Sequence, residues 1–374
     1  MRKNLWIRML AGMLGAVLLL LTGCRGSTPD AADEKPAETL DAKAERIVAS
    51  MSTAEKVGQM VMIGIQGTDV DEDSLYMLHQ YHIGGILLFD RNIESEEQTM
   101  ALTSHLQEQA GQKVPLFIGI DEEGGSVARG RGVIEPPPSQ QEIGRSGETA
   151  KAEAWAEKTA RRLKELGIQV NFAPVADVSA DKDRCYSGDP VQVEKFVRAA
   201  VQGYEMNRVM YGLKHFPGIG RGTVDSHEDI SSVTASREVL EKEDLVPFRA
   251  IINEHPELDY FILVSHLKYP AIDAEHPASQ SHAVITGLLR GDMGYDGLII
   301  TDDLEMGAVA KHGSYREAGV LAVKAGADMF MMCHEYAHQT EAYLGLLAAV
   351  ENGDIPMEQI DASVKRIVKA KLLH

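Results

Sequence analysis

The amino-acid sequence predicts an α/β protein, and three observations favour a single TIM-like (β/α)8 barrel. From residue 45 onward, short apolar runs alternate with longer amphipathic stretches, which is the pattern of βα units around a parallel sheet. There are eight such runs, the number of strands in a TIM barrel. Polar residues also follow several runs directly, where a barrel of this kind carries its active site.

The predicted strands are short apolar segments flanked by Gly, Pro or Asp, which mark turns. They span residues 58–65, 84–89, 114–120, 169–175, 212–216, 260–266, 297–301 and 327–332. Helices are predicted between them, for example over 96–110, 152–167 and 237–254, and Gly167 suits a helix C-terminus. A doubly wound open sheet remains the main alternative, because local patterning does not distinguish a closed barrel from an open sheet.

The N-terminus predicts a bacterial lipoprotein. Residues 1–8 are basic and the run from Met9 to Leu21 is apolar but too short to span a bilayer, so residues 1–23 are interpreted as a signal peptide. The string LTGC ending at Cys24 resembles the lipobox, which implies a lipidated Cys24 and an extracytoplasmic protein anchored to the cell membrane. The alternative is an ordinary cleavage site with an incidental cysteine.

The residues after Cys24 predict a tether and then one folded domain. Residues 25–40 are rich in Pro, Ala, Ser and acids and have almost no large apolar side chain, so they bury too little surface to fold. We therefore assign residues 24–42 to the lipidated cysteine and its tether, and residues 43–374 to a catalytic domain.

Composition and charge narrow the classes of partner. The chain is 44% hydrophobic and 25% charged, which is ordinary for a globular protein. Its formal charge of −19 becomes about −22 without the basic residues 1–23, which argues against a nucleic-acid partner. Cys185 and Cys333 are far apart and show no zinc spacing, so we expect two free or buried thiols, no metal and no organic cofactor. The oligomeric state expected is a monomer.

Polar side chains gather at five consecutive predicted strand ends. They are the segment 121–129, Asp177, the pair Lys214 and His215, the pair Ser265 and His266, and the segment 301–303. Taken singly, an Asp after a strand is usually a helix N-cap, and a lone His is usually structural. Their shared position at strand ends favours one functional site.

Several of these strings, in this order, resemble glycoside hydrolase family 3, in its single-domain β-N-acetylglucosaminidase branch. The similarity covers residues from about 45 to 370, and its strings are DEEGGSVAR for the family's DQEGGxVxR, NFAPVADV, DRCYSGDP for RSFxxDP, KHFPGIG, VDSH, LVSHLKYPAID and GLIITDDLEM. The resemblance implies a (β/α)8 barrel and a retaining exo-glycosidase that releases terminal β-linked N-acetylglucosamine.

The resemblance also implies the catalytic residues. Asp302 matches the nucleophile that forms a glycosyl-enzyme bond, and Asp225 with His227 matches the acid/base dyad. An ionised carboxylate suits attack on an anomeric carbon that develops positive charge, and an imidazole both donates and accepts protons near neutral pH. The segment 217–229 is rich in glycine, so we expect it to move and to bring His227 to the glycosidic oxygen in the complex.

The residues that the resemblance implies for sugar binding carry charged or polar groups that suit hydroxyls. They are Asp121, Arg129, Arg184, Lys214 and His215. Asp177 and His266 also match family positions, with roles that the resemblance leaves less defined. The chain departs from the family at Ile219 (usually His), Glu122 (usually Gln), Ser126 (usually Arg) and in DRCY for NRSF. None of the proposed catalytic positions is lost, but Ile219 removes a polar group beside the loop, which puts the order of the loop and the rate in doubt.

Two other functions remain open at this stage. A family 3 β-glucosidase or β-xylosidase normally takes its acid/base from a further domain, whereas this chain has an Asp-x-His string. A glycan-binding lipoprotein without activity has no need for a nucleophile and a proton donor together. We therefore favour hydrolysis of peptidoglycan fragments or chito-oligosaccharides, with water, or alternatively phosphate, as the acceptor.

Overall fold

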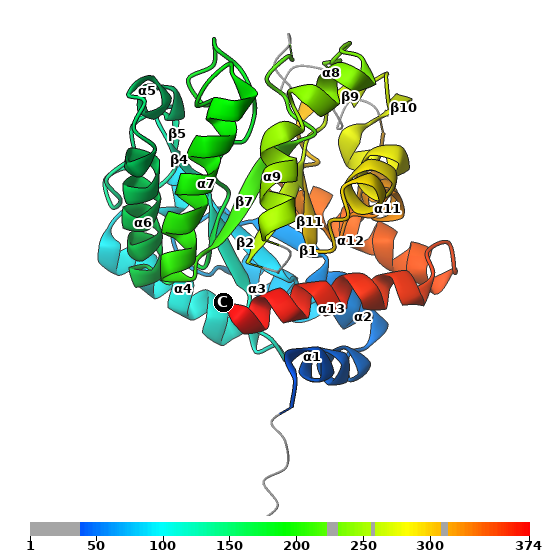
Figure 1. The fold of residues 1–374 in the computed structure, drawn as a ribbon. Coiled ribbons are helices and arrows are strands. Elements are labelled where there is room, and N and C mark those ends of the chain that lie inside the picture. The colour runs from blue at the N-terminus through cyan, green and yellow to red at the C-terminus, as the bar shows by residue number, and fades with distance from the viewer. Residues whose placement is uncertain (1–37, 223–230, 256–258, 308–312) are drawn as a thin grey trace, which may run out of the picture. The chain divides into compact units, whose positions relative to one another are not determined.

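The computed structural model describes residues 38–222, 231–255, 259–307 and 313–374, and residues Thr39–His374 form one compact unit (Figure 1). The predicted signal peptide, Cys24 and nearly all of the tether lie outside the described residues, and so do Asp225 and His227. Within the described ranges, no helix combines the length and the apolar character needed to cross a membrane.

Eight parallel strands form a closed barrel, which confirms the predicted (β/α)8 architecture. Around the barrel the order is β1-β12-β11-β8-β7-β6-β3-β2. The strands are β1 Val61–Gly64, β2 Gly85–Leu88, β3 Phe117–Ile120, β6 Val170–Asn171, β7 Met210–Phe216, β8 Tyr260–Val264, β11 Leu298–Asp303 and β12 Met329–Met332. Because β1 pairs with both β2 and β12, the sheet has no free edge, and the open-sheet alternative is wrong.

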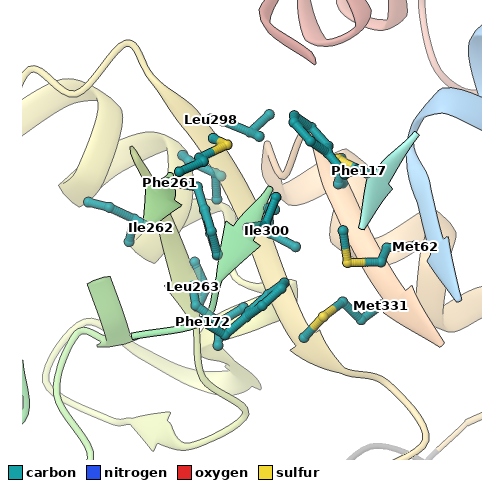
Figure 2. Close-up of a cluster of buried hydrophobic side chains, with 14 of the residues drawn as sticks. Met62, Phe117, Phe172, Phe261, Ile262, Leu263, Leu298, Ile300 and Met331 are labelled. Atoms are coloured by element: carbon teal, nitrogen blue, oxygen red, sulfur yellow. The ribbon is translucent and has the colours of Figure 1, made fainter. Parts of the chain in front are cut away.

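The barrel interior is filled by large apolar side chains from alternating strand positions (Figure 2). Phe172 and Phe261 pack edge to face with ring centroids 4.8 Å apart, and Phe117 is buried in the same cluster. A Cβ at Gly212 would lie 2.4 Å from the Phe261 ring. Glycine on β7 therefore makes room for this ring, and the filled interior closes the floor beneath the site at the carboxyl ends of the strands.

Helices surround the barrel, as expected for βα units. They are α1 Leu40–Ala49, α2 Thr53–Gln59, α3 Glu72–Tyr81, α4 Glu96–Ala110, α5 Gln140–Arg145, α6 Thr149–Glu165, α7 Pro190–Asn207, α8 Arg237–Lys242, α9 Val246–Glu254, α11 Tyr315–Ala325, α12 Tyr336–Glu351 and α13 Met357–Leu373, with 3-10 turns η1 Asp90–Asn92 and η2 Ala278–Gln280 and the π-helix η3 Ala283–Asp292. Helices α1 and α13 pack together at the end of the barrel opposite the hairpin of strands β9 Lys268–Tyr269 and β10 Asp273–Pro277 (Figure 1).

The structure corrects two sequence predictions of local structure. The helix predicted over 237–254 is two helices, α8 and α9, because Pro247 lacks an N–H group and its ring would clash with the carbonyl four residues earlier. The strand predicted over 169–175 pairs regularly only at Val170–Asn171, and Pro174, which cannot donate to a ladder, follows soon after.

Two short antiparallel hairpins were not predicted. Strands β4 Glu122–Gly124 and β5 Val127–Ala128 follow β3 directly, and strands β9 Lys268–Tyr269 and β10 Asp273–Pro277 follow β8. The first hairpin turns on Gly124 and Gly125, whose φ angles of 98° and 55° lie in the left-handed region that favours glycine. Both hairpins follow the carboxyl ends of barrel strands, and the first contributes Glu123 and Val127 to the lining of the candidate site.

Candidate active site

A cavity of about 540 Å³ opens at the carboxyl ends of the barrel strands. Its walls come from the segments after nearly every strand, and they include all six of the predicted site residues that the structure describes. These six are Asp121, Arg129, Arg184, Lys214, His215 and Asp302. The structure thus brings together residues that are up to about 180 positions apart in the chain.

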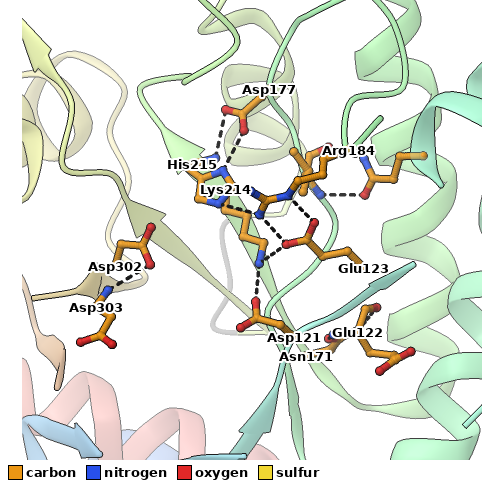
Figure 3. A network of polar contacts seen from close by, with 12 residues as sticks. Asp121, Glu122, Glu123, Asn171, Asp177, Arg184, Lys214, His215, Asp302 and Asp303 are labelled. Carbon is orange, nitrogen blue, oxygen red and sulfur yellow. Dashed lines mark hydrogen bonds and ion pairs between the residues drawn. The ribbon is translucent and has the colours of Figure 1, made fainter. Parts of the chain in front are cut away.

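One side of the cavity is an ion-pair network centred on Glu123, a residue the sequence analysis did not single out (Figure 3). Lys214 Nζ lies 2.5 Å from Glu123 Oε1 and 2.5 Å from Asp121 Oδ1. Arg184 donates two hydrogen bonds to the Glu123 carboxylate, of 2.8 Å from Nε and 2.7 Å from Nη2. The side chains of Glu123 and Lys214 are 1% and 2% exposed, so these charges are held without water.

Burial and charge act in opposite directions on this network. Burial alone raises the pKa of Glu123, but the ammonium of Lys214 and the guanidinium of Arg184 outweigh it and lower this pKa to about 2. Burial lowers the pKa of Lys214, whereas Asp121 and Glu123 raise it, and the net direction is upward. Glu123 is therefore an anion and Lys214 a cation throughout the physiological range.

His215 is fixed in one tautomer by its two neighbours. Its Nδ1 lies 2.7 Å from Asp177 Oδ2, and its Nε2 lies 3.2 Å from Arg184 Nη2. A guanidinium only donates hydrogen bonds, so Nε2 is the acceptor and the proton sits on Nδ1, pointing at Asp177. Asp177 is 1% exposed and also accepts from the backbone N–H of Ile219. Asp177, whose role the sequence left undefined, therefore holds His215 and the start of the following loop.

Asp302 faces this network from the opposite side of the cavity (Figure 3). It lies near the end of β11, at a shift in register between Ile300 and Asp303 against β12. Such a bulge re-aims a side chain, and both Asp302 and Asp303 line the cavity. Burial raises the pKa of Asp302, whereas His266, His215, the Asp303 N–H group and Lys214 lower it, and the net direction is downward.

Among the groups that lower the pKa of Asp302, Lys214 is a cation near neutral pH. Burial lowers the pKa of His266, so this ring is neutral at pH 7 and adds its positive charge only in acid. Lys214 stays protonated, and the Asp303 N–H donates to Asp302 Oδ1 at 2.9 Å. Asp302 is thus an ionised, partly exposed carboxylate at the edge of a dry polar network.

Arg129 brings an unpaired donor to the same cavity. Its Nε is buried, and no hydrogen-bond partner for this atom exists among the residues that the structure describes. Its guanidinium carbon lies 6.0 Å from the centroid of Phe89, and Phe89 in turn packs near His334 with ring centroids 5.4 Å apart. A buried donor without a partner is costly, and the same residue lines the cavity.

The sequence analysis missed the second wall of the cavity except for Asp303, which lies in the predicted polar segment 301–303. This wall consists of Phe89, Arg91, Asp303, Glu305, Met306 and His334. Within this wall, His334 Nε2 lies 3.2 Å from Asp303 Oδ2. Glu305 Oε1 lies 2.6 Å from Nδ1 of His338, a residue that does not belong to the wall. These residues could have been predicted from their positions in the sequence, at or just after the ends of the predicted strands 84–89, 297–301 and 327–332.

The predicted acid/base residues Asp225 and His227 lie outside the described residues, but the described residues on both sides of their segment have defined contacts, and Ile219 before it lines the cavity. At the entry, Lys182 Nζ lies 2.8 Å from the Ile219 carbonyl oxygen, and the Tyr269 hydroxyl donates to Gly218. At the exit, Val233 N donates to the Lys268 carbonyl oxygen at 2.8 Å. Ile219, before the segment, also donates its backbone N–H to Asp177.

The described part of the chain contains no group of three or more His, Cys, Asp or Glu side chains arranged to hold a metal ion. Cys185 and Cys333 are both free and buried, which confirms the expectation of two core thiols.

Comparison with known proteins places this site in a family. Residues 52–370 match the Glycosyl hydrolase family 3 N terminal domain. The chain belongs to glycosyl hydrolase family 3. It is 31% identical to "Beta-hexosaminidase LpqI" of Mycobacterium tuberculosis over 391 aligned residues, which cover 97% of each protein. It is also 34% identical to "Beta-hexosaminidase A" of Pseudoalteromonas piscicida, over 79% of this chain but only 54% of that relative.

Solved structures of family 3 members have the same fold. A family 3 β-N-acetylglucosaminidase from Paenibacillus superposes with a TM-score of 0.84 at 37% identity, covering 87% of this chain and 63% of that one. The structure of M. tuberculosis LpqI gives a TM-score of 0.78 at 31% identity, covering 88% of this chain and 96% of that one. The chain is therefore a glycoside hydrolase with the family 3 barrel, and it spans just over half to nearly all of the length of these relatives.

Proposed function

We propose that the protein is a retaining exo-β-N-acetylglucosaminidase that hydrolyses terminal β-linked N-acetylglucosamine through a glycosyl-aspartate intermediate. The observation that carries the proposal is the opposition of the Asp302 carboxylate to the Glu123 network across one closed-bottomed cavity. The names of the relatives support the choice of sugar.

The network is suited to hold the terminal sugar. Asp121, Arg129, Arg184, Lys214 and His215 present carboxylate, guanidinium, ammonium and imidazole groups to the cavity, and charge-assisted hydrogen bonds of this kind recognise hydroxyl and amide groups. Because the barrel interior beneath these groups is filled by large apolar side chains, the cavity has a floor, and we expect a glycan to enter by its end. This favours exo over endo cleavage.

In the first step, Asp302 attacks the anomeric carbon as its bond to the leaving oxygen breaks, and a protonated His227 donates its proton to that oxygen. In the second step, His227 takes a proton from water, the water oxygen bonds to the anomeric carbon, and Asp302 leaves as the carboxylate. Two inversions give net retention. The low pKa of Asp302 keeps it ionised at neutral pH, as the first step requires.

The acid/base assignment depends on the segment that carries Asp225 and His227. Before the segment, Ile219 lines the cavity and donates its backbone N–H to Asp177, which supports the proposal that His227 acts at this cavity. We expect this segment to bring His227 to the glycosidic oxygen when substrate is bound. The physical reason for an imidazole here is that a second bare carboxylate would be repelled by the ionised Asp302.

We further propose that the protein is a lipoprotein anchored through Cys24 to the extracytoplasmic side of the cell membrane, and that it acts on peptidoglycan fragments or chito-oligosaccharides. The basic and apolar residues 1–23 and the LTGC string support this. Metabolic labelling with a radioactive fatty acid tests it. The wild type should be labelled and found in the membrane fraction, and Cys24→Ala should lose the label.

The function is tested by release of 4-nitrophenol from its β-N-acetylglucosaminide. We expect turnover by the wild type, no detectable turnover by Asp302→Ala, and a strong loss in His227→Ala, because a retaining enzyme needs both groups. Proton NMR of the first product should show the β-anomer. Preference for the plain β-glucoside would indicate another family 3 activity, and an inactive wild type that binds sugar would indicate a glycan-binding protein.

A further inference from the structure

His266 is a buried imidazole next to the proposed nucleophile, and its role is not defined by the resemblance to the family. It follows β8 and is 1% exposed. Its Nε2 lies 2.8 Å from the backbone carbonyl oxygen of Asp303, and its Nδ1 lies 2.8 Å from Ser279 Oγ. It does not line the cavity, so any effect it has on the site passes through the residues that it contacts.

The partners of His266 determine where its proton sits. A carbonyl oxygen only accepts hydrogen bonds, so Nε2 carries the proton and donates it to Asp303. The Ser279 hydroxyl then donates to Nδ1. Ser279 is itself held, because it is fully buried and its N–H donates to the Ser265 carbonyl oxygen at 2.9 Å. One neutral tautomer satisfies both ring nitrogens.

Burial also keeps this ring neutral. It lowers the pKa of His266, although the carboxylate of Asp302, the Asp303 carbonyl oxygen and the Asp303 carboxylate act to raise it, and the nearby His215 lowers it further. A neutral ring does not screen the charge of Asp302.

The carbonyl that His266 binds belongs to a strand bulge. Between Ile300 and Asp303 the register of β11 against β12 shifts, so two residues of β11, Thr301 and Asp302, oppose one residue of β12, and the ladder is locally broken. The Asp303 carboxylate fixes one side of this bulge by accepting from the N–H groups of Glu305 at 3.0 Å and Cys333 at 3.3 Å. The carbonyl side is fixed by His266.

We propose that His266 and Ser279 position the Asp302 carboxylate: the neutral imidazole, held in one tautomer by Ser279, locks the bulge that turns Asp302 into the cavity. This inference rests on the proposed function, because it takes Asp302 as the nucleophile. Asp302 itself has few direct supports, chiefly the Asp303 N–H at 2.9 Å. Its aim therefore depends on how firmly the Asp303 peptide is held.

Four variants of the full-length protein test the proposal. His266→Leu removes the donor, and His266→Gln restores an N–H donor at nearly the same place. Ser279→Ala removes the group that fixes the tautomer. Tyr295→Phe is the matched control, because the Tyr295 hydroxyl donates to carbonyl oxygens of the same two strands, at Tyr260 and Leu298, at the far end of the barrel.

The measured quantities are kcat and KM for the 4-nitrophenyl glycoside and Tm for each variant. A displaced nucleophile costs kcat, so we expect His266→Leu to lose about 10- to 100-fold in kcat with KM changed by less than about threefold. His266→Gln should recover to within about fivefold of the wild type, and Ser279→Ala should lie between them. Tyr295→Phe should lower Tm and leave kcat unchanged.

Several outcomes would overturn the proposal. The first is a kcat of His266→Leu within twofold of the wild-type value. The second is a kcat of His266→Gln that is no higher than that of His266→Leu. The third is a loss of kcat in Tyr295→Phe as large as the loss in His266→Leu. If His266→Leu does not fold, a Ser279→Ala variant with unchanged kcat refutes the tautomer argument. Turnover by Asp302→Ala would instead reject the proposed function, whereas an inactive Asp302→Ala beside a fully active His266→Leu rejects this inference alone.

Discussion

Glu123 is the residue on which the binding side of the cavity depends, and its replacement by glutamine gives a quantitative prediction. In the wild type its carboxylate accepts two hydrogen bonds from Arg184 and lies 2.5 Å from Lys214 Nζ. Glutamine keeps the volume but removes the negative charge and one acceptor. The remaining amide oxygen can still accept a hydrogen bond, but the ion pairs of residue 123 with Arg184 and Lys214 are lost, and Lys214 keeps only its ion pair with Asp121.

The size of the effect follows from the pKa of Glu123. Folding lowers this pKa from 4.5 to about 2, and each unit corresponds to about 1.4 kcal/mol, so the ionised carboxylate stabilises the fold by about 3 kcal/mol. The same range, about 3–5 kcal/mol, is typical for breaking a buried ion pair. Because the folded pKa is depressed, this stability is fully present above pH 4.5 and is lost as the pH falls toward 2.

Thermal unfolding of the wild type and of Glu123→Gln at a series of pH values tests this. At pH 7 we expect a Tm lower by roughly 4 °C for a domain of this size, and the gap should narrow as the pH falls from 4.5 toward 2. KM for the glycoside should rise, because Lys214 and Arg184 are no longer held. A gap in Tm under 1 °C at pH 7, or one that does not change with pH, would refute the reasoning.

Three further predictions concern the surroundings of the site. Asp177→Ala should lower kcat about tenfold or more and the free energy of unfolding by about 1–3 kcal/mol, because the substitution leaves Nδ1 of the buried His215 without an acceptor. Activity assays and urea unfolding measure these losses. An unchanged kcat would contradict the role of Asp177. Burial lowers the pKa of Lys371 to about 7, so above pH 7 the unfolded chain binds more protons than the folded one. The free energy of unfolding of the wild type should therefore rise by about 2–3 kcal/mol from pH 7 to 9 relative to that of Lys371→Met. Parallel curves of unfolding free energy against pH for the two proteins would contradict this. Gly220→Ala should lower kcat roughly tenfold, because the added Cβ would lie 1.9 Å from a backbone carbonyl oxygen. Gly313→Ala is the control: its added Cβ would have no atom within 4 Å, and its kcat should stay at the wild-type value.

The sequence predicted the barrel well because each strand is a short apolar run with a marked boundary. All eight predicted runs overlap strands of the closed barrel, and the helix over 96–110 has the bounds expected. Closure itself was not readable from local patterns, since β1 pairs with β12 through residues that lie about 270 positions apart. Where prediction failed, as at the break before Pro247, a single residue overrode an otherwise continuous helical pattern.

The site was predicted in part. Residues whose side chains project from strand ends in characteristic strings, such as Asp302 and Lys214, lie together in the cavity, although no observation yet tests their chemical roles. Glu123 was missed because its importance comes from partners 61 and 91 positions away, which a sequence alone does not reveal. For the same reason the tautomers of His215 and His266 follow only from three-dimensional contacts.

Covalent trapping of Asp302 tests the central claim most directly. A 5-fluoro N-acetylglucosaminyl fluoride has a good leaving group, while its ring fluorine disfavours the positive charge of both transition states, so the glycosyl-enzyme accumulates. After digestion, mass spectrometry should find one sugar bound to the peptide that contains Asp302, with fragmentation placing it on that residue. A sugar on another residue, or turnover of the compound with no adduct at all in rapidly quenched samples, would contradict the account.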